Sequence, residues 1–277
     1  MRVHVQHGLG AGKLVDGQDF TYGPKWALWE SRPKYDVMLE ASHAVAARAV
    51  AACPPLKGRI AVVGDLRADR VLAADRRRTV HRLRLGLGAG DVAVLVTSTF
   101  GPHGMIGRHG WAYLDAALGL PPPFRTILCL HPHLWTGRHD NRTRLTELLA
   151  SRVGQGLIMC GPDDDFAPYL AAADVAVIDH GSLGLYWALL ARPTVAVPVP
   201  AHALNLTAPI AALRASAPLA VEPGRLGAGI DRALSVFDPE VFAPHRRSLV
   251  ARPGHAADAL RAVFYELVGL DAPPKAA

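Results

Sequence analysis

Residues 173–195 read ADVAVIDHGSLGLYWALLARPTV, and this stretch indicates the fold class. Val175–Ile178 form a short apolar run with an aspartate on either side, which is the pattern of a strand buried on both faces. Residues 182–190 have the Leu- and Ala-rich composition of a helix, and a β-branched run follows at 194–197. A strand, a helix and a second strand in this order predict a parallel unit of an α/β sheet.

The same alternation continues on the amino-terminal side of this stretch. Further strands are expected at residues 92–96, 126–130 and 156–159, and helices at residues 142–152 and 166–173. We therefore expect residues 89–268 to form a complete Rossmann-type domain with a parallel sheet, the kind of domain that binds nucleotides.

The first part of the chain is expected to contain less regular structure. Strands are expected at residues 3–6, 35–39 and 60–63, with one clear helix at 42–52. A glycine-rich break at residues 86–90 marks a boundary. We therefore expect a partial α/β domain over residues 1–88 and a flexible, Pro-rich tail over residues 269–277.

Composition excludes several classes of protein. The chain has 277 residues, of which 50% are hydrophobic and 19% are charged, so it can form a large core and is not a disordered chain. No apolar run approaches the ~20 residues of a membrane span. Cys53, Cys129 and Cys160 are widely spaced without a metal-binding pattern, which predicts a reducing, cytoplasmic environment.

The chain is basic. It has 30 Lys and Arg against 24 Asp and Glu, a net charge of +6, which favours anionic partners such as nucleotides or an acidic membrane surface. Residues 76–78 are three consecutive arginines, and Arg82 and Arg84 follow. Because aromatic residues make up only 6% of the chain and no zinc motif accompanies the run, we interpret it as the exposed face of a helix and expect no nucleic-acid partner.

Polar residues follow most of the expected strands, and ligands of open parallel sheets bind beyond the carboxyl ends of the strands. The candidate cleft residues are His7 and Lys13 around a glycine-rich turn, Arg67 and Asp69, Ser98 and Thr99, His131, and Asp179, Gly181 and Ser182. His131 and His133 have no third ligand at metal-binding spacing. We therefore expect neither a metal site nor a cofactor.

Several candidates also have a purely structural interpretation. Lys13 suits an ordinary turn, and His131 suits a buried structural histidine. Asp65 and Asp69 suit a capped helix start that is ion-paired with Arg67, and this is the interpretation that these three residues alone favour.

The turn after Ile178 gives the strongest anion-binding signal. A strand is expected to end at Asp179 and a helix to begin near Ser182, so the amides of residues 181–184 are expected to be free and to face a ligand. The helix dipole adds attraction for a phosphate. The Ser182 hydroxyl suits both a ligand contact and an N-cap.

Taken in order, these motifs resemble the CDP-glycerol:poly(glycerophosphate) glycerophosphotransferase family. The motifs are His7-Gly8 with a following Lys13, residues 64–69 (GDLRAD), His131-Pro132, and residues 173–193, in which Asp-x-x-Ser precedes Ala-Leu-Leu-x-Arg-Pro. The match extends from His7 to about Leu267. The resemblance implies a GT-B-like fold of two Rossmann-type domains, with most of the amino-terminal one lacking here.

The resemblance also implies an activity and a place in the cell. Members of the family take a CDP-activated alcohol as donor and pass a polyol phosphate to a polyol-phosphate or glycan acceptor, in the synthesis of teichoic-acid or related cell-surface polymers. The enzyme would be cytoplasmic, with peripheral contact to the anionic inner face of the plasma membrane.

The resemblance further implies a division of labour. His7 would be the general base for the acceptor hydroxyl, and His131 would stabilise the transferring phosphate or protonate the leaving group. The donor pyrophosphate would be bound by Asp179, Gly181, Ser182 and Lys13. The remaining cleft residues would be Arg67, Asp69, Ser98 and Thr99.

Departures from the family pattern bear on the substrate. His180-Gly181 replaces a Tyr-Ser pair, and Lys13 stands one place later than the family's lysine. Two alternatives therefore stay open. One is a GT-B-fold glycosyltransferase or sugar-nucleotide epimerase that uses a nucleotide sugar, although an epimerase would need an acid that residues 183–186 do not offer. The other is a truncated, non-catalytic nucleotide-binding protein.

Overall fold

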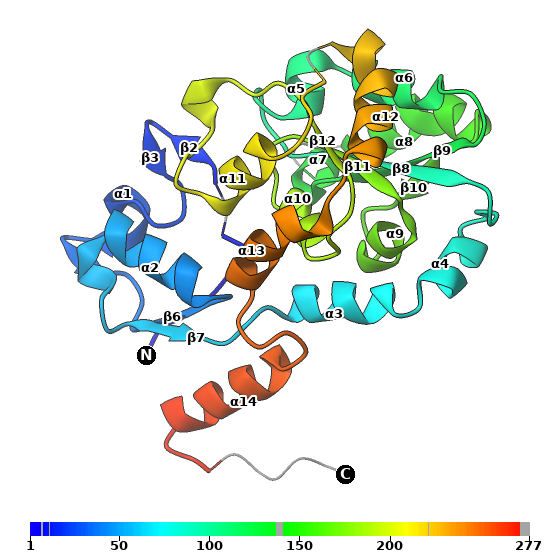
Figure 1. Cartoon of the computed structure of the whole chain (residues 1–277). Helices are drawn as coiled ribbons and strands as arrows, with labels where there is room; N and C mark the ends of the chain where they lie inside the picture. The colour runs from blue at the N-terminus through cyan, green and yellow to red at the C-terminus, as the bar shows by residue number, and fades with distance from the viewer. Residues whose placement is uncertain (7, 11, 137–140, 221, 272–277) are drawn as a thin grey trace.

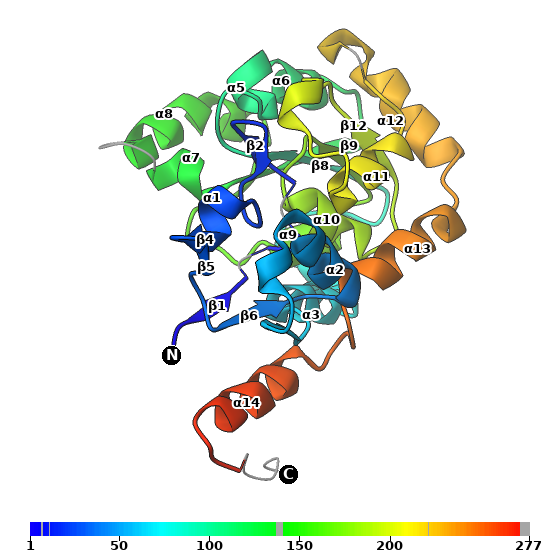
Figure 2. The same ribbon diagram turned by 90° about the vertical axis from the view of Figure 1, so that its left-hand side faces the viewer.

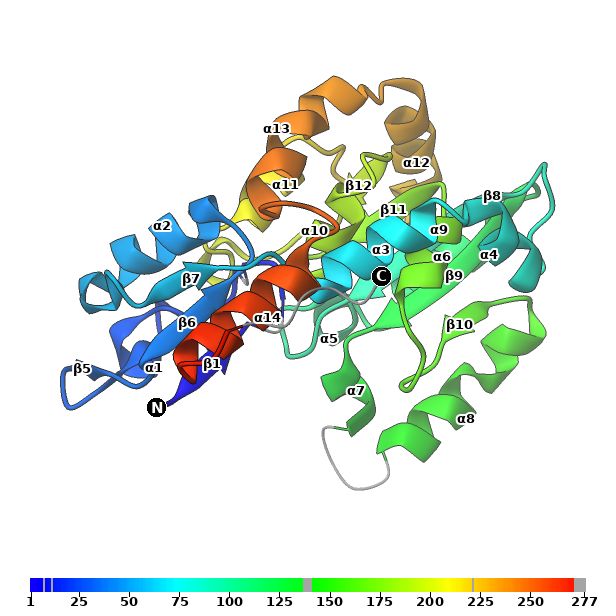
Figure 3. The same ribbon diagram turned by 90° about the horizontal axis from the view of Figure 1, so that it is seen from below.

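The computed structural model describes residues 1–271 except residues 7, 11, 137–140 and 221, so residues 272–277 of the expected tail lie outside it. Two parallel sheets form the framework, and helices flank them (Figure 1). The larger sheet has the strand order β10-β9-β8-β11-β12, and the smaller has the order β1-β6-β7. Figure 3 shows the smaller sheet to one side of the larger one.

The larger sheet contains the strands predicted for residues 89–268. They are β8 (Val92–Ser98), β9 (Phe124–Leu130), β10 (Ile158–Cys160), β11 (Val175–Ile178) and β12 (Thr194–Ala196). All neighbouring strands run parallel. Val96 of β8 lies opposite Leu128 of β9 on one side and opposite Val177 of β11 on the other.

Helices cover both faces of this sheet, because successive side chains of a strand point to opposite sides. Leu95 belongs to a core with α3 (Leu66–Asp75), α9 (Ala167–Ala172), α10 (Leu183–Ala188) and α13 (Pro239–Leu249). Val96 belongs to a core on the other face with α6 (Ala112–Leu118), α8 (Asn141–Gly154) and α12 (Leu226–Ser235). Double-sided burial explains why these strands read as nearly continuous apolar runs.

Shorter helices complete this part of the chain. They are α4 (Arg78–Arg84), α5 (Met105–His109), α7 (Pro132–Thr136), α11 (Pro209–Ala215) and the 3-10 turns η2 (Ala201–Ala203) and η3 (Pro223–Arg225). Among the described residues, no helix combines the length and the apolarity needed to cross a bilayer.

The smaller sheet contains the three strands predicted for the first part of the chain. They are β1 (Val3–Val5), β6 (Val37–Glu40) and β7 (Ile60–Val62), and the predicted helix is α2 (His43–Ala52). The sequence did not predict the elements between β1 and β6 or the turn after α2. These are β2 (Leu14–Val15), β3 (Gln18–Asp19), α1 (Pro24–Ala27), β4 (Leu28–Trp29), β5 (Arg32–Pro33) and η1 (Pro54–Leu56).

A buried polar cluster joins this first part to the residues after β12. Asp19 accepts hydrogen bonds from Arg48 (2.5 Å) and from the Asn205 amide nitrogen Nδ2 (2.9 Å). Tyr22 donates its hydroxyl to Glu40 (2.8 Å), and the Arg48 guanidinium lies 4.8 Å from the Tyr22 ring centroid. Glu40 is fully buried, and this burial raises its pKa to about 7.

The end of the chain returns toward the first part. α13 packs against α2, and α14 (Ala256–Leu267) packs against α3. Asp69 accepts hydrogen bonds from the amides of Gly254 (2.5 Å) and Ala256 (2.9 Å), and so ties α3 to the start of α14. Figure 2 shows α14 at the lower edge of the molecule.

Three arginines hold the carboxyl-terminal end of α9. Arg78 and Arg82 pair with Asp174 at 2.5 and 2.8 Å, and both also donate to the last carbonyl groups of this segment. Arg192 donates to the same carbonyl groups and pairs with Asp75. The prediction of an exposed arginine face is therefore wrong for Arg78 and Arg82, which the end of a helix attracts through its carbonyl groups and dipole.

Candidate functional site

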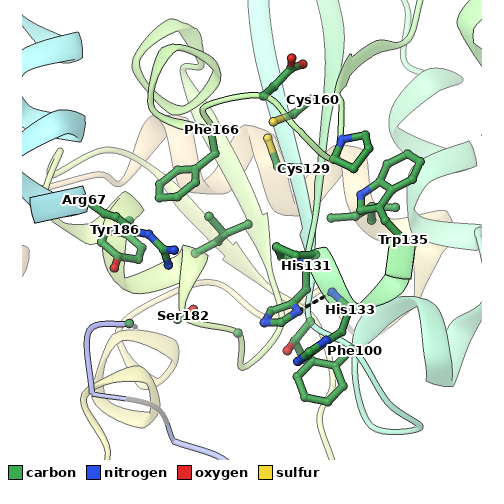
Figure 4. A pocket seen from close by; sticks show the side chains of 18 of the residues that line it. Arg67, Phe100, Cys129, His131, His133, Trp135, Cys160, Phe166, Ser182 and Tyr186 are labelled. Atoms are coloured by element: carbon green, nitrogen blue, oxygen red, sulfur yellow. Dashed lines mark hydrogen bonds between the residues drawn. The ribbon is translucent and has the colours of Figure 1, made fainter. Parts of the chain in front are cut away.

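A cavity of about 770 Å³ lies at the carboxyl ends of β8, β9, β10 and β11. β8, the first of these strands in the chain, lies between β9 and β11, so the strand order reverses between β8 and β11. Open parallel sheets bind their ligands at the carboxyl ends of the strands beside such a reversal. The volume is typical of small-molecule sites. In Figure 4, Arg67 and Tyr186 stand on one side of the cavity, and His131 and His133 on the other.

Asp179 joins two loops at this edge and does not line the cavity. Its carboxylate is buried and accepts three backbone amides, from Thr99 (2.8 Å), Met105 (2.9 Å) and Gly181 (2.8 Å). These bonds occupy both oxygens and hold the loop after β8 against the loop after β11. The structure thus gives Asp179 a different position from the phosphate contact that the resemblance implies.

Ser98 also shapes a loop behind the cavity wall. Its Oγ donates to the Thr99 carbonyl (3.0 Å) and accepts the Ile106 amide (3.0 Å). Thr99 itself lines the cavity. Gly181 is needed beside it, because a Cβ at this position would lie 3.0 Å from the Thr99 Cβ.

The backbone amides of residues 181–184 are only partly available to a ligand. The Gly181 amide donates to Asp179, and the Gly184 amide donates to the Gly181 carbonyl (3.2 Å). The prediction that all four amides are free is therefore wrong for these two. Ser182 makes no capping bond to the part of the chain that the structure describes, and it lines the cavity (Figure 4), so its hydroxyl can contact a ligand.

A tightly packed glycine turn places Lys13 at the cavity. Gly10 has a φ of +60°, which favours glycine, and a Cβ on Gly12 would lie 2.7 Å from the Ala208 Cβ. The Lys13 ammonium lies 3.7 Å from the centroid of the Phe100 ring. Among the described residues no carboxylate forms an ion pair with Lys13, and burial lowers its pKa.

A hydrogen bond determines the tautomer of His131. Its Nδ1 accepts the backbone amide of His133 (3.1 Å), as the dashed line in Figure 4 shows. An acceptor nitrogen carries no proton, so the neutral ring carries its proton on Nε2. Phe100 packs against both imidazoles, with ring centroids 4.7 and 4.8 Å away.

His180 is a buried histidine in the cavity wall that sequence reasoning did not select. It is 5% exposed, and its Nδ1 has no hydrogen-bond partner among the described residues. Burial lowers its pKa, Asp179 opposes this effect, and the cations Arg214 and Lys13 add to it. The ring is therefore mainly neutral at pH 7. Its position directly after a strand, where the family pattern has tyrosine, was the available signal.

Arg67 lines the cavity from the first turn of α3. Asp65 caps this helix by accepting the Ala68 amide (2.7 Å), as the sequence predicted, and it also accepts the Tyr186 hydroxyl (3.2 Å). Burial raises the pKa of Asp65. Asp69 lies away from the cavity, bound to the start of α14.

The loop after β10 brings acidic side chains to the cavity. Asp163, Asp164 and Asp165 all line the cavity. Asp165 pairs with Arg70 (2.9 Å), and Asp164 accepts the Tyr169 hydroxyl (2.7 Å), which lowers the pKa of Asp164. The cavity thus has a basic wall, formed by Lys13, His131 and His133 around Phe100, and an acidic wall, formed by residues 163–165. The sequence pointed to residues of the basic wall only.

The structure brings together most of the predicted cleft residues. The cavity is lined by Lys13, Arg67, Thr99, His131, Gly181 and Ser182. Behind its wall or away from it lie Asp69, Ser98 and Asp179. His7 falls outside the described residues, and its neighbours Gln6 and Gly8 line the cavity. Lining residues that the sequence did not single out include Phe100, His133, His180, Tyr186 and residues 163–165.

Comparison with known proteins finds similarity in structure only. No protein-family model and no curated protein matches the sequence. The structure of the wall teichoic acid polymerase TagF superposes with a TM-score of 0.65 at 11% identity, over 96% of this chain and 68% of that chain. A TagF variant soaked with CDPG for 30 minutes gives 0.62 at 11% identity, over 96% and 66%.

A second kind of structure matches less well. Anabaena Alr3699/HepE in complex with UDP and glucose gives a TM-score of 0.46 at 16% identity, over 85% of this chain and 64% of that chain. A TM-score this low does not establish a shared fold. The likeness to TagF confirms the predicted α/β, GT-B-like fold class. The chain spans about two thirds of the length of the TagF chains, and fold alone does not determine chemistry.

Proposed function

We propose that this chain is a transferase that binds a nucleotide diphosphate donor in the cavity and moves a polyol phosphate from a CDP-activated alcohol to a hydroxyl acceptor. The observation that carries the proposal is the meeting of Lys13, His131 and His133 around one ring at the carboxyl edge of the sheet. Basic groups at this edge attract a diphosphate. The fold of TagF, one of whose structures was soaked with CDPG, supports the choice of donor.

The reaction exchanges one phosphorus–oxygen bond for another. The acceptor hydroxyl oxygen attacks the phosphorus that carries the polyol, and the anhydride bond to that phosphorus breaks, so that CMP leaves with the electron pair. The hydroxyl proton passes to a base, the role that the resemblance gives to His7. Catalysis of this kind depends on positioning and on neutralising the phosphoryl oxygens, and we assign the neutralising charge to Lys13.

His131 suits the role of a hydrogen-bond donor in this reaction. Because its Nδ1 accepts the His133 amide, its Nε2–H can donate to a phosphoryl oxygen or to the leaving group. The same bond leaves no basic nitrogen on Nε2 in the neutral ring, so His131 does not suit the role of general base. We propose that Ser182 contacts the donor pyrophosphate, that Gly181 keeps the backbone beside it free of a side chain, and that Asp179 acts only by holding their loop.

We propose further that the acceptor is a polyol phosphate or a glycan of a teichoic-acid type of polymer. The net charge of +6 is consistent with an anionic acceptor and with peripheral contact at the inner face of the plasma membrane. A cytoplasmic location belongs to the same proposal.

Product release tests the proposal. We expect the purified chain to release CMP from CDP-glycerol when poly(glycerophosphate) is supplied, as measured by chromatography of the nucleotides. Release of UDP from UDP-glucose would instead favour the glycosyltransferase alternative. Binding of CDP without turnover of either donor would favour a non-catalytic protein.

A further inference from the structure

Phe100 lies at the centre of the basic wall of the cavity. The Lys13 ammonium is 3.7 Å from its ring centroid, and the His131 and His133 rings are 4.7 and 4.8 Å away. The two imidazoles also stack on each other at 5.1 Å. Figure 4 shows Phe100 directly beside both histidines. One aromatic ring therefore contacts both Lys13, the cation of the proposed diphosphate site, and His131, the proposed hydrogen-bond donor of the reaction.

The backbone that carries this ring is held rigidly. The Thr99 amide donates to the buried Asp179 carboxylate (2.8 Å). On the other side, Gly104 packs so closely that a Cβ there would lie 2.3 Å from the Thr99 carbonyl oxygen. The lysine has a flexible four-carbon stem, so the fixed ring restrains Lys13.

We infer that Phe100 is a positioning residue that holds the Lys13 ammonium and the His131 imidazole together at the diphosphate site. The face of an aromatic ring attracts an ammonium group without neutralising its charge, whereas a carboxylate would neutralise it and compete with a phosphate. The ring also packs against the imidazole of His131, whose Nδ1 is bonded to the His133 amide. The inference rests on the proposed function for its consequence, which is tighter binding of a diphosphate.

The first test needs no ligand. The chain has five lysines, and the ε-methylene protons of a lysine held over a ring resonate upfield of the others in an NMR spectrum. We expect such a resonance from Lys13, which Lys13→Met removes and so assigns. A resonance from Lys25, whose ammonium lies 5.3 Å from the Trp26 ring centroid, would persist in that variant. Phe100→Leu should return the Lys13 resonance to the range of the other lysines, whereas Phe100→Tyr should retain it. Phe166→Leu is the matched control, because the Phe166 ring lines the same cavity but packs against Tyr186.

The second test measures CDP affinity by isothermal titration calorimetry. We expect Phe100→Leu to weaken CDP binding by about threefold to tenfold, no more than the loss of Lys13 itself, and Phe100→Tyr to bind CDP nearly as the unaltered protein does.

The outcomes separate this inference from the proposed function. An unaltered protein without an upfield lysine resonance that Lys13→Met removes would overturn the inference, even if Phe100→Leu did not fold. A Phe100→Leu protein with unchanged CDP affinity would also overturn it, provided that the unaltered protein binds CDP. An upfield Lys13 resonance in a protein that does not bind CDP would support the positioning role and contradict the proposed function.

Discussion

Two clusters of basic side chains lie at opposite ends of the strands of the larger sheet, and they differ in their partners. At the amino-terminal edge, Arg78, Arg82 and Arg192 bind carboxylates and the carbonyl groups at the end of α9. At the carboxyl edge, Lys13 lies over an aromatic ring, and His131 accepts a backbone amide. The first cluster is saturated by the protein itself, and the second offers charge to a ligand.

The difference shows why basic composition alone does not locate a site. Arg192 is so enclosed that burial lowers its pKa to about 10 despite the nearby carboxylates. Burying such a cation costs desolvation free energy, and the guanidinium stays charged in the folded protein only because its partners compensate for that cost. Lys13 lies beside the cavity and pairs with no carboxylate among the described residues. An anionic ligand could therefore provide the compensation that carboxylates give to Arg192. The following changes test this contrast, from the largest expected effect to the smallest.

Replacing His131 should have the largest effect on activity. We expect His131→Ala to lower the transfer rate by about 10³-fold, the scale of a lost charge-stabilising hydrogen-bond donor, and to change CDP affinity by less than about twofold. Steady-state release of CMP and calorimetric titration of CDP measure the two quantities. His43→Ala, at an exposed position, is the control. Equal losses of rate and affinity would contradict a role confined to the transition state.

Replacing Arg192 should affect stability and spare binding. Arg192→Met leaves Asp75 without its partner and removes one of the arginines that hold the end of α9, so the free energy of unfolding should fall by about 3 kcal/mol. Chemical denaturation measures this, and the exposed Arg84→Met should stay within about 0.5 kcal/mol of the unaltered protein. If Arg192→Met lost CDP affinity while remaining stable, the two clusters would not be separate in role.

The cluster around Glu40 provides a third case, because Oε1 of this buried carboxylate has no partner among the described residues. Its pKa of about 7 in the folded chain exceeds the ~4.3 of an unfolded glutamate. The folded state then binds more protons between these values, so stability should fall as pH rises from about 4.5 to about 7, by about 2 to 3 kcal/mol.

The Glu40→Gln variant isolates this contribution. It should lose that part of the pH dependence of the unfolding free energy, as measured by denaturation at several pH values. The exposed Glu30→Gln should retain it. A pH dependence unaltered in Glu40→Gln would show that Glu40 is ionised in the folded protein at low pH.

Replacing Ser182 should have the smallest effect of this series. Its hydroxyl makes no capping bond, so Ser182→Ala should leave stability unchanged and weaken binding of CDP-glycerol by about 1 to 2 kcal/mol, the scale of a lost hydrogen bond to a charged group. Calorimetry measures both the affinity and the binding heat. An unchanged titration would remove Ser182 from the donor site.

The sequence predicted those features that depend on neighbouring residues. The buried strands β8 and β9 read as continuous apolar runs, and Asp65 stands in the right place to cap α3. The hairpin strands β2 and β4 were missed because two residues carry too little periodicity to be recognised.

The sequence could not predict contacts between distant segments. Asp69 is hydrogen-bonded to the amides of residues 254 and 256, far along the chain. Asp179 sits at a strand end, as a ligand-binding residue would, yet its oxygens hold backbone amides 74 and 80 positions away, at Met105 and Thr99. Phe100 shows the reverse, because nothing in its local sequence reveals that a lysine and two histidines converge on it.

The most direct test of the central claim is the titration of CDP into the unaltered protein, into Lys13→Met and into Lys57→Met, whose site is exposed on the surface. If the basic wall of the cavity is the diphosphate site, Lys13→Met should bind CDP about tenfold more weakly, a loss of about 1.4 kcal/mol, and Lys57→Met should bind it unchanged. Equal affinity of Lys13→Met and the unaltered protein, or no binding by either, would contradict the account.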